Sequence, residues 1–180
     1  SASQRLRRHQ AVQRIRAARW VRQGLGGVEY PQVVAKDLLI AQADDATFAR
    51  ELPGRLDLEN FLRYTAVTAV LANYDSYVGN GHNYYLFQPA AGGKASFVPW
   101  DLNEAFGGHP PAGSRAEQAA LSVLHPQAAA NRLIERVLAR TNWFAAYRHE
   151  LATILTNVCA PERLLADANR VIPVVRETVF

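Results

Sequence analysis

Three polar residues in one short stretch of the chain could together bind a metal ion. The stretch 73–107 reads NYDSYVGNGHNYYLFQPAAGGKASFVPWDLNEAFG. It places Asp75 in a turn, Asn83 directly before a run of strand-forming residues, and Asp101 directly after a second run. Carboxylate and amide oxygens are hard ligands that suit Mg²⁺ or Mn²⁺ and do not suit a soft zinc site. An aspartate that orients a hydroxyl, followed by an asparagine and an aspartate that bind metal, is the order of residues used in phosphoryl transfer.

A predicted β-hairpin would bring these three residues together. Residues 84–87 and 95–98 are strand formers, and a Gly-rich segment joins them. Because a hairpin brings its outer ends together, Asn83 should lie beside Asp101, which follows 18 residues later. Asp75 comes eight residues before Asn83, in a loop that two glycines allow to turn tightly. We therefore expect all three side chains to face one cleft.

The same stretch resembles the spore coat protein H (CotH) kinase family, an atypical branch of the protein-kinase-like fold. The resemblance is close over residues 57–108 and looser in the helical tail as far as residue 175. It implies a mainly α fold with a small β-hairpin, of the kind found in the C-terminal lobe of a protein kinase. The segments that carry the resemblance are Asn73–Tyr77, Gly79–Asn80, His82–Phe87, Pro99–Asn103 and Ala105–Gly108.

The resemblance also assigns a role to each candidate residue. Asp75 resembles the catalytic-loop aspartate that orients the attacking hydroxyl, and Asn83 resembles the catalytic-loop asparagine that helps to bind metal. Asp101 resembles the metal-binding aspartate of the Asp-Phe-Gly motif. Asn80 lies five residues after Asp75, the ordinary kinase spacing, and competes with Asn83 for the metal role. We favour Asn83 because it directly precedes the strand.

Three further polar residues are weaker candidates. His82 could be a ligand or a base, although a turn histidine bonded to backbone is the simpler interpretation. Asn103 is a secondary candidate beside Asp101, and Glu104 could add an acidic metal contact or be solvated. The histidines of the following loop, His109 among them, lack the spacing of a zinc site and receive no role.

The implied activity is metal-dependent transfer of the γ-phosphoryl group of ATP to Ser or Thr of a protein. Its cofactors would be ATP with Mg²⁺ or Mn²⁺, and its partner a protein substrate. Two other functions stay open, a non-catalytic scaffold that retains the fold and a metal-dependent hydrolase that uses the same carboxylates. The sequence does not choose between a bacterial cytoplasm and a cell-envelope or spore-coat setting.

One departure from the kinase pattern concerns the nucleotide. A kinase holds the ATP phosphates with a Gly-rich loop and a lysine on the small lobe. The chain has two lysines, Lys36 and Lys94, and neither sits where that lysine belongs. We expect this chain to contain mostly the large lobe. Methionine is absent altogether, so we also expect that the start of the translated protein is missing.

Composition excludes several classes of protein. The 180 residues are 49% hydrophobic, without an apolar run that could span a membrane or a secretory signal. The single cysteine excludes an internal disulfide. Residues 1–36 hold eight basic side chains and one acidic one, against 12 and 15 in the remainder. We interpret this charge as the solvated face of a helix and expect no nucleic-acid partner.

Hydrophobic spacing predicts the other elements around the motif. Residues 1–36 should form a basic helix (3–23) and a loop, and residues 37–180 a kinase-like lobe. In that lobe we expect an interrupted helix over 37–50, a chain break at Pro53-Gly54, and a buried central helix capped by Asp57. Later helices are predicted at 115–123, 130–140, 142–157 and from Pro161, with Leu164, Leu165, Ala168 and Ile172 inward and Pro173 ending or kinking the helix. The aromatic residues Tyr84, Tyr85, Trp100 and Phe106 are predicted to be core.

Overall fold

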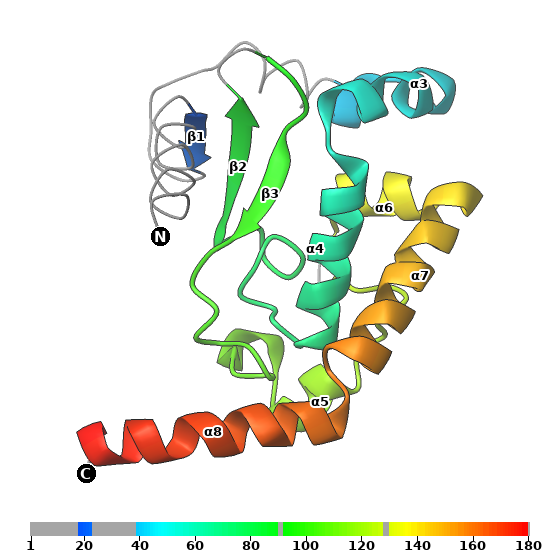
Figure 1. The fold of residues 1–180 in the computed structure, drawn as a ribbon. Coiled ribbons are helices and arrows are strands. Elements are labelled where there is room, and N and C mark those ends of the chain that lie inside the picture. The colour runs from blue at the N-terminus through cyan, green and yellow to red at the C-terminus, as the bar shows by residue number, and fades with distance from the viewer. Residues whose placement is uncertain (1–17, 23–38, 90–91, 128–129, 180) are drawn as a thin grey trace.

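The computed structural model describes residues 18–22, 39–89, 92–127 and 130–179. Within them a small antiparallel sheet stands on one side of a helical body, and a long C-terminal helix runs away from it (Figure 1). The expected mainly α fold with a small β-hairpin is confirmed. The elements are β1 (Ala18–Arg22), α3 (Asp45–Arg55), α4 (Leu58–Val70), β2 (Tyr84–Pro89), β3 (Ser96–Pro99), a 3₁₀ turn (Pro110–Ala112), α5 (Arg115–Ala119), α6 (Arg132–Leu138), α7 (Thr141–Asn157) and α8 (Pro161–Val179).

Helix α4 is the centre of the fold, as predicted. The Asp57 side chain caps it by accepting the Asn60 backbone N–H at 3.1 Å. The helix packs against β3 on one side and α7 on the other (Figure 1). Its Phe61 ring lies 5.0 Å from the Phe97 ring of β3, so the hairpin is fastened to the helix by buried aromatic contacts.

The hairpin is confirmed, and a third strand joins it. β2 pairs with β3 from Tyr84↔Pro99 to Phe87↔Ser96, and its other edge pairs with β1. The prediction of a basic helix over 3–23 is therefore wrong at 18–22, and its remainder lies outside the described residues. At 18–22 the local preference for helix is overridden by a contact with a distant part of the sequence. A strand paired with the edge of β2 satisfies backbone N–H and C=O groups that would otherwise be unpaired.

The first predicted helix is interrupted as expected, but it does not end at Pro53-Gly54. Residues 39–42 are helical, and Asp44 then caps α3 by accepting the Thr47 N–H at 2.8 Å. The helix continues through Pro53 to Arg55. Pro53 lies in the last turn, where it removes a single backbone hydrogen bond, and the Leu56 N–H still donates to the Leu52 carbonyl at 2.8 Å.

The later helices lie where they were predicted, with one error of burial. α6 and α7 pack on each other and contribute the buried side chains of Leu133, Ile134, Tyr147 and Leu151. The predicted inward face of α8 is instead exposed, and Pro173 does not end that helix. Figure 1 shows that most of α8 runs away from the helical body, which agrees with this exposure.

The predicted aromatic core is half correct. Tyr84 packs against the core and Tyr85 is half-buried. Trp100 and Phe106 are 52% and 63% exposed, so their assignment to the core was wrong. Both lie on the loop that follows β3. No helix in the described part of the chain has the length and apolar character needed to cross a membrane.

Candidate active site

The loop after α4 carries Asp75 and is held in a tight turn by its own backbone. The Ser76 hydroxyl donates to the Asn73 carbonyl at 2.6 Å, and the Ser76 carbonyl accepts the N–H groups of residues 79–82 at 3.0–3.3 Å. A Cβ atom on Gly79 would lie 1.9 Å from the Tyr74 carbonyl oxygen. Position 79 must therefore be glycine for the loop to fold back on itself.

A second loop, after β3, lies against the first. The Trp100 N–H donates to the Asn83 carbonyl at 3.1 Å. Further along, Phe106 and Gly107 donate to the carbonyls of Leu71 and Ala72 at 2.6 and 3.2 Å. These bonds place residues 71–83 beside residues 100–109.

Two asparagine amides hold the Asp75 carboxylate. Asn80 Nδ2 donates to Asp75 Oδ1 at 2.8 Å, and Asn83 Nδ2 donates to Asp75 Oδ2 at 2.6 Å and to the Asp75 carbonyl at 3.0 Å. The orientation of Asn80 is fixed because its Oδ1 accepts the His82 N–H at 3.1 Å. With both oxygens held, the carboxylate is oriented while half-buried.

The mouth of the hairpin brings the backbones of Asn83 and Asp101 together. Both adopt the left-handed conformation, with φ of 49° and 46°, which asparagine and aspartate tolerate better than other side chains. Within the described residues, neither the exposed Asp101 carboxylate nor Asn83 Oδ1 has a hydrogen bond or ion pair. This pair of uncommitted hard oxygens fits Mg²⁺ or Mn²⁺. Their approach within about 6 Å stays a prediction, made because one hydrated cation spans that distance.

His109, to which the sequence alone gives no role, lies beside Asp75 and Asn80. His109 Nδ1 contacts Glu104 Oε2 directly and lies 4.0 Å from Asp75 Oδ1. Its Nε2 lies 3.5 Å from Asn80 Nδ2. Glu104 and His109 thus extend the network that begins at Asp75, and their side chains are mostly buried.

Gln118 of α5 holds the histidine loop in position. Its Nε2 lies 2.8–3.1 Å from the carbonyl oxygens of Gly107, His109 and Gly113. α5 itself begins with a capping box between Ser114 and Glu117, where two hydrogen bonds from the Ser114 N–H and hydroxyl lower the pKa of the Glu117 carboxyl. That capping box is visible in the sequence, but nothing local connects it to Asp75.

The weaker candidates from the sequence, His82 and Asn103, lie at the edge of the Asp75 network. His82 is exposed, with Nδ1 3.9 Å from Asp75 Oδ1. Asn103 is exposed, and its side chain has no hydrogen bond within the described part of the chain.

One ligand atom from each of Asp75, Glu104 and His109 lies within 4.8 Å of the others. This second donor set includes an imidazole and so differs in chemistry from the oxygens at the hairpin mouth.

An aspartate held by two amides beside the mouth of a hairpin, on a mainly helical lobe, agrees with the kinase-like class of protein that the sequence predicts. The profile of the CotH kinase protein family matches residues 33–179, and the chain belongs to this family. It is similar to the inner spore coat protein H of Bacillus subtilis (strain 168), with 29% identity over 83 residues. That match covers 45% of this chain and 22% of the length of the relative.

Proposed function

We propose that this CotH-family chain supports metal-dependent transfer of the γ-phosphoryl group of ATP to a Ser or Thr hydroxyl of a protein. The observation that carries the proposal is the Asp75 carboxylate, which accepts hydrogen bonds from the amide groups of Asn80 and Asn83. Membership in a kinase family agrees with it.

Asp75 would act on the hydroxyl group that receives the phosphoryl group. Each of its oxygens accepts one amide hydrogen bond and keeps a lone pair with which to orient the hydroxyl. As the hydroxyl oxygen bonds to the γ-phosphorus, the bond from that phosphorus to the β,γ-bridging oxygen breaks. ADP leaves with that electron pair, and the hydroxyl proton passes to Asp75. Most of the catalytic effect comes from positioning, so the hydrogen bonds from the Asn80 and Asn83 amides to Asp75 are part of the mechanism.

Asp101 and Asn83 would hold the divalent cation. When bound, the cation supplies charge stabilisation for the phosphoryl oxygens. Asn83 would have two roles, because its nitrogen donates a hydrogen bond to Asp75 and its oxygen would supply a hard ligand for the cation.

The test is phosphoryl transfer by the full-length protein. Asp75→Asn and Asp101→Ala should each remove most transfer of labelled γ-phosphate to a Ser/Thr substrate, with the fold retained. Asp167→Asn, on an exposed turn of α8, is the matched control and should keep the wild-type rate. Wild-type transfer by Asp101→Ala would refute the proposal.

A non-catalytic role is the second candidate. The name of the relative, a spore coat protein, favours a structural role in a spore coat. Under this alternative, both aspartate variants would assemble normally, and the wild-type protein would transfer no phosphate at any metal concentration.

A further inference from the structure

Glu104 and His109 form a pair of side chains that has no part in the transfer proposed above. His109 Nδ1 contacts Glu104 Oε2 directly, and the histidine and glutamate side chains are 12% and 33% exposed. The other ring nitrogen, Nε2, faces the Asn80 amide nitrogen at 3.5 Å. Because Asn80 is one of the two residues whose amides hold Asp75, the pair reaches the Asp75 carboxylate through one intervening side chain.

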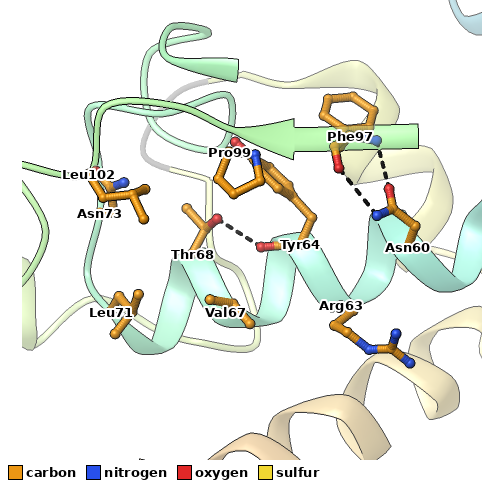
Figure 2. A pocket seen from close by; sticks show the side chains of 10 residues that line it. All are labelled: Asn60, Arg63, Tyr64, Val67, Thr68, Leu71, Asn73, Phe97, Pro99 and Leu102. Carbon is orange, nitrogen blue, oxygen red and sulfur yellow. Dashed lines mark hydrogen bonds between the residues drawn. The ribbon is translucent and has the colours of Figure 1, made fainter. Parts of the chain in front are cut away.

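The loops that carry these residues start from elements that are fixed to each other. Figure 2 shows the pocket between α4 and β3, where the Asn60 amide exchanges two hydrogen bonds with the Phe97 backbone at 3.2 and 2.6 Å. On the loop after β3, the His109 carbonyl oxygen lies 2.8 Å from Gln118 Nε2. The His109 backbone is thus held independently of its ring, and the ring contacts add a separate constraint on Asn80.

The orientation of the Asn80 amide decides which ring nitrogen of His109 should carry the proton. Asn80 Oδ1 accepts the His82 N–H at 3.1 Å, so the NH₂ group is the side that faces both Asp75 and His109. A separation of 3.5 Å is long for a hydrogen bond, but at this distance an N–H group is attracted to a ring nitrogen with a free lone pair and repelled by a ring N–H. The contact therefore favours an unprotonated Nε2, and a neutral ring then carries its proton on Nδ1.

We propose that Glu104 is a positioning residue that selects the Nδ1–H tautomer of His109 and thereby helps to orient Asn80 and Asp75. An ionised carboxylate only accepts hydrogen bonds, so Glu104 holds the ring proton on Nδ1 and leaves the Nε2 lone pair for Asn80. In serine proteases an aspartate fixes the tautomer of the catalytic histidine in the same way. Here the histidine acts on an amide and transfers no proton, so the expected effect on the rate is smaller.

An imidazolium ring is the alternative that the Asn80 contact disfavours. His109 Nδ1 also lies 4.0 Å from Asp75 Oδ1, and two carboxylates near one ring would suit a positive charge. Such a ring would carry an Nε2–H that faces the Asn80 NH₂ group, so that two donors would oppose each other. The imidazolium and the two neutral tautomers give different ¹⁵N signals, which makes the alternatives separable by experiment.

Long-range ¹H–¹⁵N correlation spectra of the histidine-labelled protein test the tautomer. They are recorded at about pH 8, where an unperturbed imidazole is neutral, and with EDTA so that no metal ion replaces the ring proton. The signals that disappear in His109→Gln identify the ring. The wild-type ring should show a protonated Nδ1 and an unprotonated Nε2, and an Nε2–H tautomer or an imidazolium would overturn the proposal.

Variants at position 104 test whether the carboxylate sets the tautomer. Glu104→Leu should raise the share of the Nε2–H form, whereas Glu104→Gln keeps an acceptor oxygen and should show a smaller change. Glu162→Leu, at an exposed position of α8, is the matched control and should leave the His109 signals unchanged. A ring that stays fully in the Nδ1–H form in both Glu104 variants would mean that Glu104 does not select it. If Glu104→Leu does not fold, Glu104→Gln decides the matter.

Kinetics of phosphoryl transfer by the full-length protein test the positioning, and this part of the inference rests on the proposed function. Glu104→Leu should lower kcat about two- to tenfold through the loss of one hydrogen bond, with a smaller change in substrate KM. In a His109→Ala background the same substitution should have no further effect, because Glu104 acts only through His109. Additive losses would overturn the proposed route. Because the spectra require no phosphoryl transfer, failure of this inference is distinguishable from failure of the proposed function.

Discussion

Gly79→Ala is the sharpest test of how the backbone positions Asp75. The added Cβ would lie 1.9 Å from the Tyr74 carbonyl oxygen, and real Cβ atoms essentially never approach another heavy atom closer than 3.0 Å. The turn must therefore open by about 1 Å at residues 74 and 79, on either side of Asp75, and a displacement of about 1 Å can lower a catalytic rate by about 100-fold.

The expected result is a drop of about 100-fold in kcat for phosphoryl transfer by the full-length protein, measured with labelled ATP. Substrate KM should change less, because the acceptor contacts outside the loop are retained. Thermal unfolding of the same variant should show a lower Tm, since the four N–H groups around the Ser76 carbonyl would no longer fit.

Two glycine controls separate the clash from other effects. Gly81→Ala, in the same loop at a φ of 78°, meets nothing within 4 Å and should cost only about 1–2 kcal/mol of left-handed strain. Gly54→Ala, in α3, also meets nothing and should be neutral or stabilising. A Gly79→Ala protein with wild-type Tm and kcat would refute the argument that close backbone approach shapes this loop.

Two more predictions follow from the network and the core. His109→Ala should lower kcat about two- to tenfold through the loss of one contact to Asn80, whereas His109→Gln, which restores an acceptor near Nε2, should recover part of the rate. Burial raises the pKa of Tyr64 to about 12 and also raises that of Tyr147, above the ordinary value of about 10. The unfolded chain therefore loses these protons first, and the free energy of unfolding should fall between about pH 10 and 12 by up to 1.4 kcal/mol per pH unit for each tyrosine. Urea midpoints at pH 9 and 11 check this, and Tyr64→Phe should reduce the difference; equal midpoints would contradict it.

Local patterns in the sequence predicted the elements that hold the site. The Asp57 cap and the apolar spacing after it are sufficient for α4, and the two runs of strand formers with glycines between them are sufficient for the hairpin. The pairing of Asn83 with Trp100 follows from hairpin geometry alone. These features depend on neighbours within about 20 residues, which is the range over which sequence patterns are informative.

The predictions that were wrong or missing share one cause: each depends on contacts between residues that are far apart in the sequence. Helical spacing shows that α8 has an apolar face, but it cannot show whether another element lies opposite. Strand β1 depends on the free edge of β2, and the exposure of Trp100 depends on what covers the loop after β3. His109 escaped notice for the same reason, because it reaches Asp75 only through the backbone bonds that join residues 71–72 to 106–107.

Under the proposed function, an asparagine at position 83 would let one small site serve both an acceptor hydroxyl and a cation. An aspartate there would place a second carboxylate oxygen about where Nδ2 now lies, 2.6 Å from Asp75 Oδ2, and the two negative charges would repel each other or share a proton. The amide removes that conflict, since its nitrogen donates to Asp75 and its oxygen still offers a hard ligand on the other side. The neutral side chain thus orients Asp75 by a hydrogen bond, and under the proposed function the cation would be held by Asp101 and Asn83 Oδ1. Under this division of roles, the left-handed backbone of Asn83 would be the conformation that lets one amide serve both.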